Sequence, residues 1–196
     1  MRGEKFGRIV WVAILLLGVC GSLLAADLPG VWLDVPFVKQ EKDGCGAASI
    51  AMVMQYWQAQ QGLPANDTSD ASQIQRTLYL AKAHGIYASD MERYFQEKGF
   101  RTFTIRGEWE DLEQHLRKGR PLIVALRPVA LKPVALKLSS GSALHYVVVT
   151  GLGPDVVMIN DPAQRKLLQQ DRPSFEREWN AAGKWTLLAL PQTQPR

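Results

Sequence analysis

The chain has 196 residues, of which 46% are hydrophobic and 21% charged, a composition typical of a globular protein with one packed core. Residues 1–26 hold three of the 23 basic residues and one of the 19 acidic ones, so the rest of the chain carries only about +2 of the formal net charge of +4. This weak charge, without any run of lysine or arginine interleaved with aromatic residues, argues against a nucleic-acid-binding protein.

The first 26 residues are typical of a secretory signal. Three basic residues between positions 2 and 8 precede an uncharged, apolar run over residues 9–26. The run is also about long enough for a retained membrane anchor, and LGVC at 17–20 resembles a bacterial lipidation box. We expect a periplasmic or extracellular protein. A cleaved signal is favoured over membrane attachment through residues 1–26, and both are favoured over lipidation at Cys20.

The pattern of apolar residues predicts helices first and mostly antiparallel strands afterwards. An extended lead-in at 35–38 precedes a helix from Cys45 to about Gln58, whose apolar or small residues indicate burial on most sides. Later helices are predicted at 72–83, 89–98, 109–118 and 175–181, and strands at 100–106, 122–126, 146–150, 156–160 and 185–190. Ser89 and Ser174 are the predicted caps of two helices. This order indicates an α+β fold in one domain, residues 27–191, followed by a tail at 192–196.

A tandem repeat interrupts the second half of the chain. PVALK occurs at 128–132 and again at 133–137, upstream of His145. Irregular segments tolerate insertion, which favours a simply expanded loop over a flap that covers a functional site.

Cys45 is the only cysteine outside the predicted signal, so the mature protein cannot form an internal disulfide. A thiol attacks as the thiolate, and the partial positive charge of a helix N-terminus favours that form. Gly44 and Gly46 would leave the thiol uncrowded and let a substrate backbone approach. The N–H groups of the first helical turn could bind an oxyanion, with Gln40 as a side-chain donor from the preceding loop. A small buried core cysteine is the alternative interpretation.

Three histidines are candidate partners for this thiol. His84 lies at a predicted helix end, where capping or solvation is the expected role, and His115 is expected to be exposed on a polar helix. His145 opens a strand and is followed by a hairpin, so it is the favoured partner.

An antiparallel hairpin centred on Gly153 would set His145 directly opposite Asp161, on the same face of the sheet. A carboxylate there can accept a hydrogen bond from the imidazole and favour the imidazolium beside a thiolate. A slip of one residue, with a bulge, would offer Asn160 instead. A polar pair that merely satisfies itself at a sheet end is the other interpretation.

The sequence predicts neither a metal site nor a cofactor. It contains no CxxC, no HExxH and no close pair of histidines, and this spacing argues against zinc binding. It also lacks the glycine-rich motifs GxxxxGK[ST] and strand-linked GxGxxG that hold nucleotides.

Several stretches together resemble the bacteriocin-processing (double-glycine leader) cysteine peptidases, peptidase family thirty-nine, which have a papain-like fold. The stretches are VPFVKQEKDGCGAASIAMVMQYW, HYVVVTG, VVMINDPA and FEREWNAAGKWTLLALP, and they span nearly all of the chain after residue 26.

The resemblance implies that Cys45 is the nucleophile, His145 the general base and acid, and Asp161 the residue that orients the histidine. Gln40 would be an oxyanion-hole donor. Many family members place this glutamine one residue further upstream and an acidic residue directly before the cysteine, where this chain has Gly44. No ATPase motif is present, so cleavage at a Gly-Gly site is not carried over.

Three functions are compatible with these residues. The first is an exported cysteine peptidase that acts on a peptide or protein substrate through a thioester. The second is a catalytically silent peptide-binding module of the same fold. The third keeps the thioester but changes the acceptor, which would make the protein a transpeptidase or an amidase.

Overall fold

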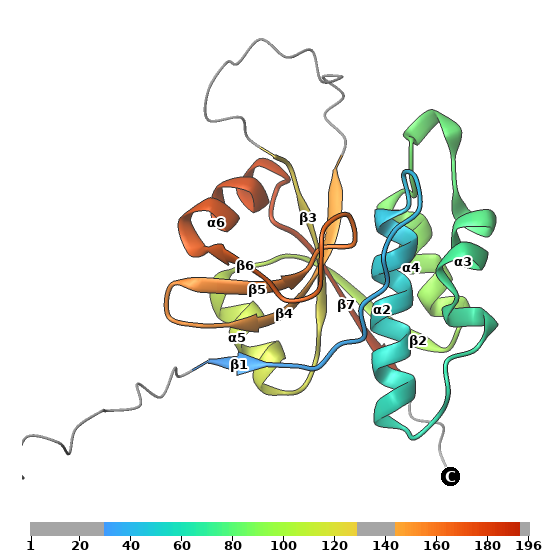
Figure 1. Cartoon of the computed structure of the whole chain (residues 1–196), viewed down its shortest axis with the longest axis horizontal. Coiled ribbons are helices and arrows are strands. Elements are labelled where there is room, and N and C mark those ends of the chain that lie inside the picture. The colour runs from blue at the N-terminus through green and yellow to red at the C-terminus, as the bar shows by residue number, and fades with distance from the viewer. Residues whose placement is uncertain (1–29, 129–143, 193–196) are drawn as a thin grey trace, which may run out of the picture.

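The computed structural model describes residues 30–128 and 144–192 (Figure 1). The predicted signal with Cys20, the PVALK repeat beyond Pro128 and the last four residues of the tail lie outside the described residues. The predicted domain boundaries therefore stay predictions.

A single antiparallel sheet of seven strands organises the fold, and together with the helices it confirms the predicted α+β class. The strands are β1 (Val31–Trp32), β2 (Phe100–Arg106), β3 (Leu122–Leu126), β4 (His145–Leu152), β5 (Val156–Asn160), β6 (Leu168–Asp171) and β7 (Trp185–Pro191). They lie in the order β2-β7-β3-β4-β5-β6, and β1 pairs with the end of β4. β1 and β6 were not predicted, because each is short and lacks a recognisable apolar alternation.

Five α-helices accompany the sheet in the described residues. They are α2 (Cys45–Gln60), α3 (Ala71–Leu78), α4 (Ala88–Glu97), α5 (Trp109–Arg117) and α6 (Arg172–Ala181), with short 3₁₀ turns at Asp67–Ser69 and Ala81–Ala83. The lead-in predicted at 35–38 has no regular structure.

Both predicted caps are wrong. α4 begins after Tyr87 and has no side-chain cap, which places Ser89 inside the helix. α6 begins three residues earlier than predicted, and the carboxylate of Asp171 accepts from the backbone N–H of Ser174. Proline in the first turn of α6 is compatible with this early start, because no backbone donor is needed there.

The helices cover both faces of the sheet and form two cores (Figure 1). α2 and α4 pack on one face, while α5 and α6 pack on the other. α2 also contacts α3, so its central residues are almost completely buried, as predicted: Ile50, Ala51, Met52 and Val53 are at most 1% exposed. This packing fixes α2 against β4 and brings the start of the helix to the end of the sheet where β4 begins.

Candidate active site

Cys45 is the first residue of α2 and is half-buried. Gly44 precedes the helix and has no side chain to cap it, so the first-turn N–H groups receive no side-chain hydrogen bond. A helix N-terminus without a cap offers free backbone donors and partial positive charge beside the sulfur. The structure therefore places the thiol where an anion would be stabilised.

Gly44 and Gly46, which flank Cys45, have a different structural role from the one predicted. Both are buried and packed against protein rather than open to a substrate. A Cβ on Gly44 would lie 2.4 Å from Oε1 of Gln75, and one on Gly46 would lie 3.2 Å from Cβ of Ile86. Nε2 of Gln75 also donates to the carbonyl of Lys42 at 2.8 Å. The glycines thus let α3 and the segment before α4 approach the turn that carries the thiol.

His145 and Asp161 meet across the β4–β5 hairpin. Nε2 of His145 lies 2.8 Å from Oδ1 of Asp161, and the aspartate is only 3% exposed. The predicted register is nevertheless wrong, because β4 pairs Val148 with Asn160 and has a bulge between Val149 and Gly151. Continuing this register would set Asp161 opposite Val147.

The two side chains still meet because the register shift preserves their face. His145 lies two residues before Val147 on the same face of β4, so the imidazole reaches the carboxylate diagonally. The bulge adds Thr150 to β4, and the Thr150 carbonyl accepts from Leu33 N at 2.7 Å. Next to the turn, Leu152 pairs with Val157, three residues beyond its predicted partner, and the bulge reduces this displacement to two, which restores the predicted face.

Asp161 is held by two further donors that the sequence did not point out. Its Oδ1 also accepts from Ala163 N at 2.9 Å, and Oδ2 accepts from Nε2 of Gln164 at 2.6 Å. The first of these is an Asx turn, for which aspartate followed by Pro162 is an available sequence signal. These two bonds hold the carboxylate in the position from which it bonds His145.

The charges of the three predicted residues are coupled. Burial alone would lower the pKa of His145, but hydrogen bonds to Asp161 and Cys45, and their negative charges, raise that pKa to about 9. Burial likewise opposes ionisation of Asp161, yet His145, Ala163 and Gln164 hold its pKa below the ordinary value. Burial, with the charge of Cys45, raises the pKa of Tyr146 to about 12.

Since Nε2 of His145 bonds Asp161, Nδ1 is the ring nitrogen left for Cys45.

Gln40 joins the same group through its backbone. Its N–H donates to the carbonyl of Pro162 at 3.0 Å, which ties the loop before Cys45 to the turn after Asp161. Its side-chain Oε1 is buried and accepts no hydrogen bond from the described residues. The structure thus brings all four predicted residues to one place.

Asn160, the alternative to Asp161, points elsewhere. It is completely buried, its Nδ2 donates to Val35 O at 3.1 Å, and its Oδ1 accepts from Leu167 N at 2.9 Å. These bonds hold two irregular segments together, and His145 bonds Asp161 instead.

Replacing Asn160 by alanine is expected to lower the free energy of unfolding by about 2–3 kcal/mol, because a buried carbonyl and a part-buried N–H group lose their partners. Urea denaturation measures this change. Asn180→Ala, at an exposed position of α6, is the matched control and should stay within about 0.5 kcal/mol of the parent. An Asn160→Ala protein as stable as this control would contradict the structural role.

In the described residues, no hydrogen bond or ion pair joins the other two histidines to Cys45, His145 or Asp161. His84 is exposed, has a left-handed backbone with φ of 48°, and its Nδ1 lies 3.9 Å from Oδ2 of Asp43. His115 is half-buried rather than exposed, and its burial and the neighbouring Arg120 and Lys118 lower its pKa.

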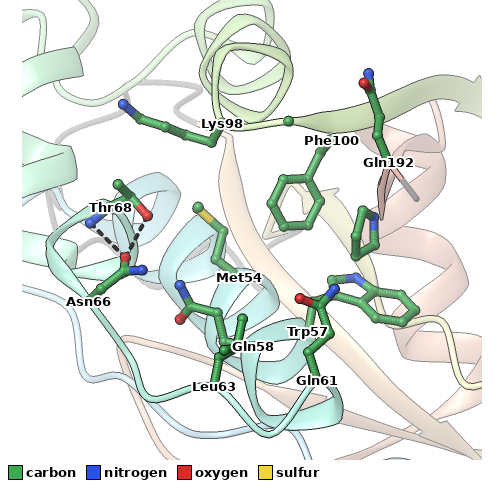
Figure 2. A pocket seen from close by; sticks show the side chains of 12 residues that line it. Met54, Trp57, Gln58, Gln61, Leu63, Asn66, Thr68, Lys98, Phe100 and Gln192 are labelled. Atoms are coloured by element: carbon green, nitrogen blue, oxygen red, sulfur yellow. Dashed lines mark hydrogen bonds between the residues drawn. The ribbon is translucent and has the colours of Figure 1, made fainter. Parts of the chain in front are cut away.

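Two cavities have different relations to the candidate site. One of about 360 Å³ is lined by His145 and Asp161. A second, of about 560 Å³, lies toward the other end of α2 (Figure 2), where Met54, Trp57 and Phe100 line it together with polar side chains. This larger cavity contains none of the four predicted residues, so size alone would have indicated the wrong place.

Within the described residues no group of three or more histidine, cysteine, aspartate or glutamate side chains is arranged to hold a metal ion. None of the helices that the structure describes combines the length and apolar character needed to cross a membrane.

Solved structures share the fold. A double-glycine motif protease from an AMS/PCAT transporter, in complex with its leader peptide, is 22% identical with a TM-score of 0.59, and the match covers 83% of this chain and 95% of that one. The peptidase domain of Streptococcus ComA is 21% identical (TM-score 0.57, 79% and 97% covered), and a C39-like peptidase from Bacillus anthracis is 20% identical (0.59, 84% and 99%). These likenesses confirm the predicted papain-like fold.

Sequence comparison gives the family. No curated protein sequence matches the chain. The model of the Peptidase_C39 like family matches residues 32–187, a range that includes α2, the β4–β5 hairpin and the start of β7. The chain belongs to the Peptidase_C39 like family.

Proposed function

We propose that this chain is an exported cysteine peptidase that hydrolyses peptide bonds with Cys45, His145 and Asp161. The observation that carries the proposal is the 2.8 Å contact between His145 and the buried Asp161, beside a half-buried cysteine at the start of a helix. Membership of a family of peptidase-like proteins supports it. Export through residues 1–26 is part of the proposal.

In the first step the Cys45 thiolate attacks the carbonyl carbon of the peptide. The developing oxyanion would accept hydrogen bonds from the Cys45 N–H and the side-chain amide of Gln40. His145, protonated at Nδ1, gives that proton to the leaving amine, and the C–N bond breaks to leave a thioester. Asp161, bonded to Nε2, keeps the ring oriented and stabilises the imidazolium.

In the second step water completes the hydrolysis. Neutral His145 takes a proton from water, and the resulting hydroxide attacks the thioester carbonyl. The C–S bond breaks, the carboxylic acid leaves, and the Cys45 thiolate and the His145 imidazolium are restored.

A peptide substrate fits this site. One structural neighbour was crystallised with a leader peptide, which supports a peptide as the ligand of the shared fold. A preference for double-glycine sites does not follow from the fold, and we do not propose it.

Hydrolysis of a diverse peptide library by the purified chain is expected to have an alkaline limit near pH 9. The pKa of His145 is about 9, above its ordinary value of 6.5, so the imidazolium persists at neutral pH and is lost as the pH rises through about 9. Because the imidazolium protonates the leaving amine, kcat/KM should fall about tenfold per pH unit above that value. Initial rates measured from about pH 5 to about pH 10.5 provide the check.

Mass spectrometry of the products separates the alternatives. New carboxyl termini in water, unchanged by added amines, support hydrolysis. Products joined to an added amine would indicate a transpeptidase, and binding without any cleavage would indicate a silent peptide-binding module.

A further inference from the structure

The cavity of about 360 Å³ is lined by His145 and Asp161 but not by Cys45. Its walls come from β3, from β5 and β6, and from α6, and they include Asp161. Figure 1 shows α6 beside β6, on the side of the sheet away from α2. None of its lining residues belongs to the helices α2, α3 or α4.

The chemistry of the proposed reaction indicates which half of the substrate this cavity would contact. The imidazole must reach the nitrogen of the leaving amine, so the chain that follows the scissile bond passes along the imidazole. A cavity bordered by that imidazole, and not by Cys45, is next to the leaving-group half of the substrate. It can receive a side chain from one of the first residues after the cleaved bond.

The lining has one carboxylate available to a ligand. Asp161 is already paired with His145 and Gln164. Glu178, on α6, forms no ion pair within residues 30–128 and 144–192, and its Oε2 only accepts from Nε2 of Gln170 at 3.2 Å. The positive charge of the His145 imidazolium is balanced by Asp161, and no lysine or arginine is among the lining residues in the described part of the chain. The cavity therefore favours a cation.

The remaining lining fits a long basic side chain. Leu126, Ile159 and Leu168 form an apolar wall that can pack against methylene groups, as the stems of lysine and arginine prefer. The backbone of Glu178 is anchored, because its carbonyl accepts from Arg127 N at 3.0 Å. Glu178 thus lines the cavity from a helix whose backbone is tied to the residue after β3.

We propose that this cavity is a subsite for a lysine or arginine side chain at the first or second position after the scissile bond, with Glu178 as its anionic partner. The inference rests on the proposed peptidase function and extends it to substrate class. Glu178 would set specificity and take no part in bond cleavage.

The test uses a set of peptides that differ only at these two positions, with lysine, arginine, norleucine, glutamine or glutamate. The parent protein should cleave the basic peptides with a kcat/KM about tenfold above norleucine or glutamine. Glu178→Gln, which keeps the shape and can still accept from Gln170, should lose this preference and leave the norleucine rate within about twofold. Glu178→Lys should reverse the preference toward glutamate.

The matched control is Glu176→Gln, since Glu176 is on the same helix but pairs with Arg172 and does not line the cavity. It should keep the preference for basic peptides. Cleavage by the parent without any such preference, or a preference that survives Glu178→Gln, would overturn the subsite alone. Absence of all cleavage by the parent would overturn the peptidase function, and the subsite with it.

Discussion

Replacement of Cys45 by alanine is expected to reduce kcat for peptide hydrolysis by at least about 10⁴-fold, because no other group in the site can form the thioester. The fold should tolerate the change. Alanine is a strong helix former, and the substitution removes one half-buried sulfur at the first position of α2. Single-turnover kinetics and a thermal melt of the same sample measure both effects.

The chain supplies its own control for this experiment. Cys20→Ala makes the same substitution at the only other cysteine, which lies in the predicted signal, and kcat should not change. Iodoacetamide should label the parent at Cys45 and fail to label Cys45→Ala at that position. Turnover by folded Cys45→Ala above about 1% of the parent rate would rule out the thioester route.

The second large effect is expected at Asp161. Asp161→Asn should lower kcat by about 10²–10⁴-fold with little change in KM, because the neutral amide no longer stabilises the imidazolium or fixes its tautomer. The hydrogen bond and charge of Asp161 are among the causes that raise the pKa of His145 to about 9. Their loss lowers that pKa, so the alkaline limit of kcat/KM should move below pH 9.

This shift of the pH profile separates a positioning role from a purely structural one. Asp155→Asn, in the exposed turn of the same hairpin, is the control and should leave both kcat and the profile unchanged. An Asp161→Asn protein with low kcat but an alkaline limit still at about 9 would show that Asp161 only supports the fold. Oδ2 of Asp161 also binds Gln164 at 2.6 Å, so the variant must be shown to be folded.

Much of the fold could be read from local patterns. The bounds of β2, β3 and β5 coincide with the predicted strands, and α2 begins at Cys45 as expected. These elements have a clear apolar period or a glycine before the first turn, and both signals act within a few residues. Where two local signals competed, as at the starts of α4 and α6, the predicted cap was wrong.

The candidate site, like the fold, could be predicted only in part from local patterns. The sequence singled out Cys45 and His145 from their local contexts, but it paired His145 with Asp161 through a register that the displaced turn and the bulge near Gly151 change. The pairing survived only because the shift kept both side chains on one face. The second donor to the carboxylate, Gln164, had no separate signal.

The sequence by itself determined most of the helices and strands of this protein, because periodicity and backbone sterics act over a few neighbouring residues. It also determined the residue types at the start of α2 and in the β4–β5 hairpin. Only the tertiary structure decided which ring nitrogen of His145 meets Asp161, and that Glu178 shares a cavity with that pair. These relations join segments far apart in the chain. They depend on how α2 and α6 pack against opposite faces of one twisted sheet, which no local pattern encodes.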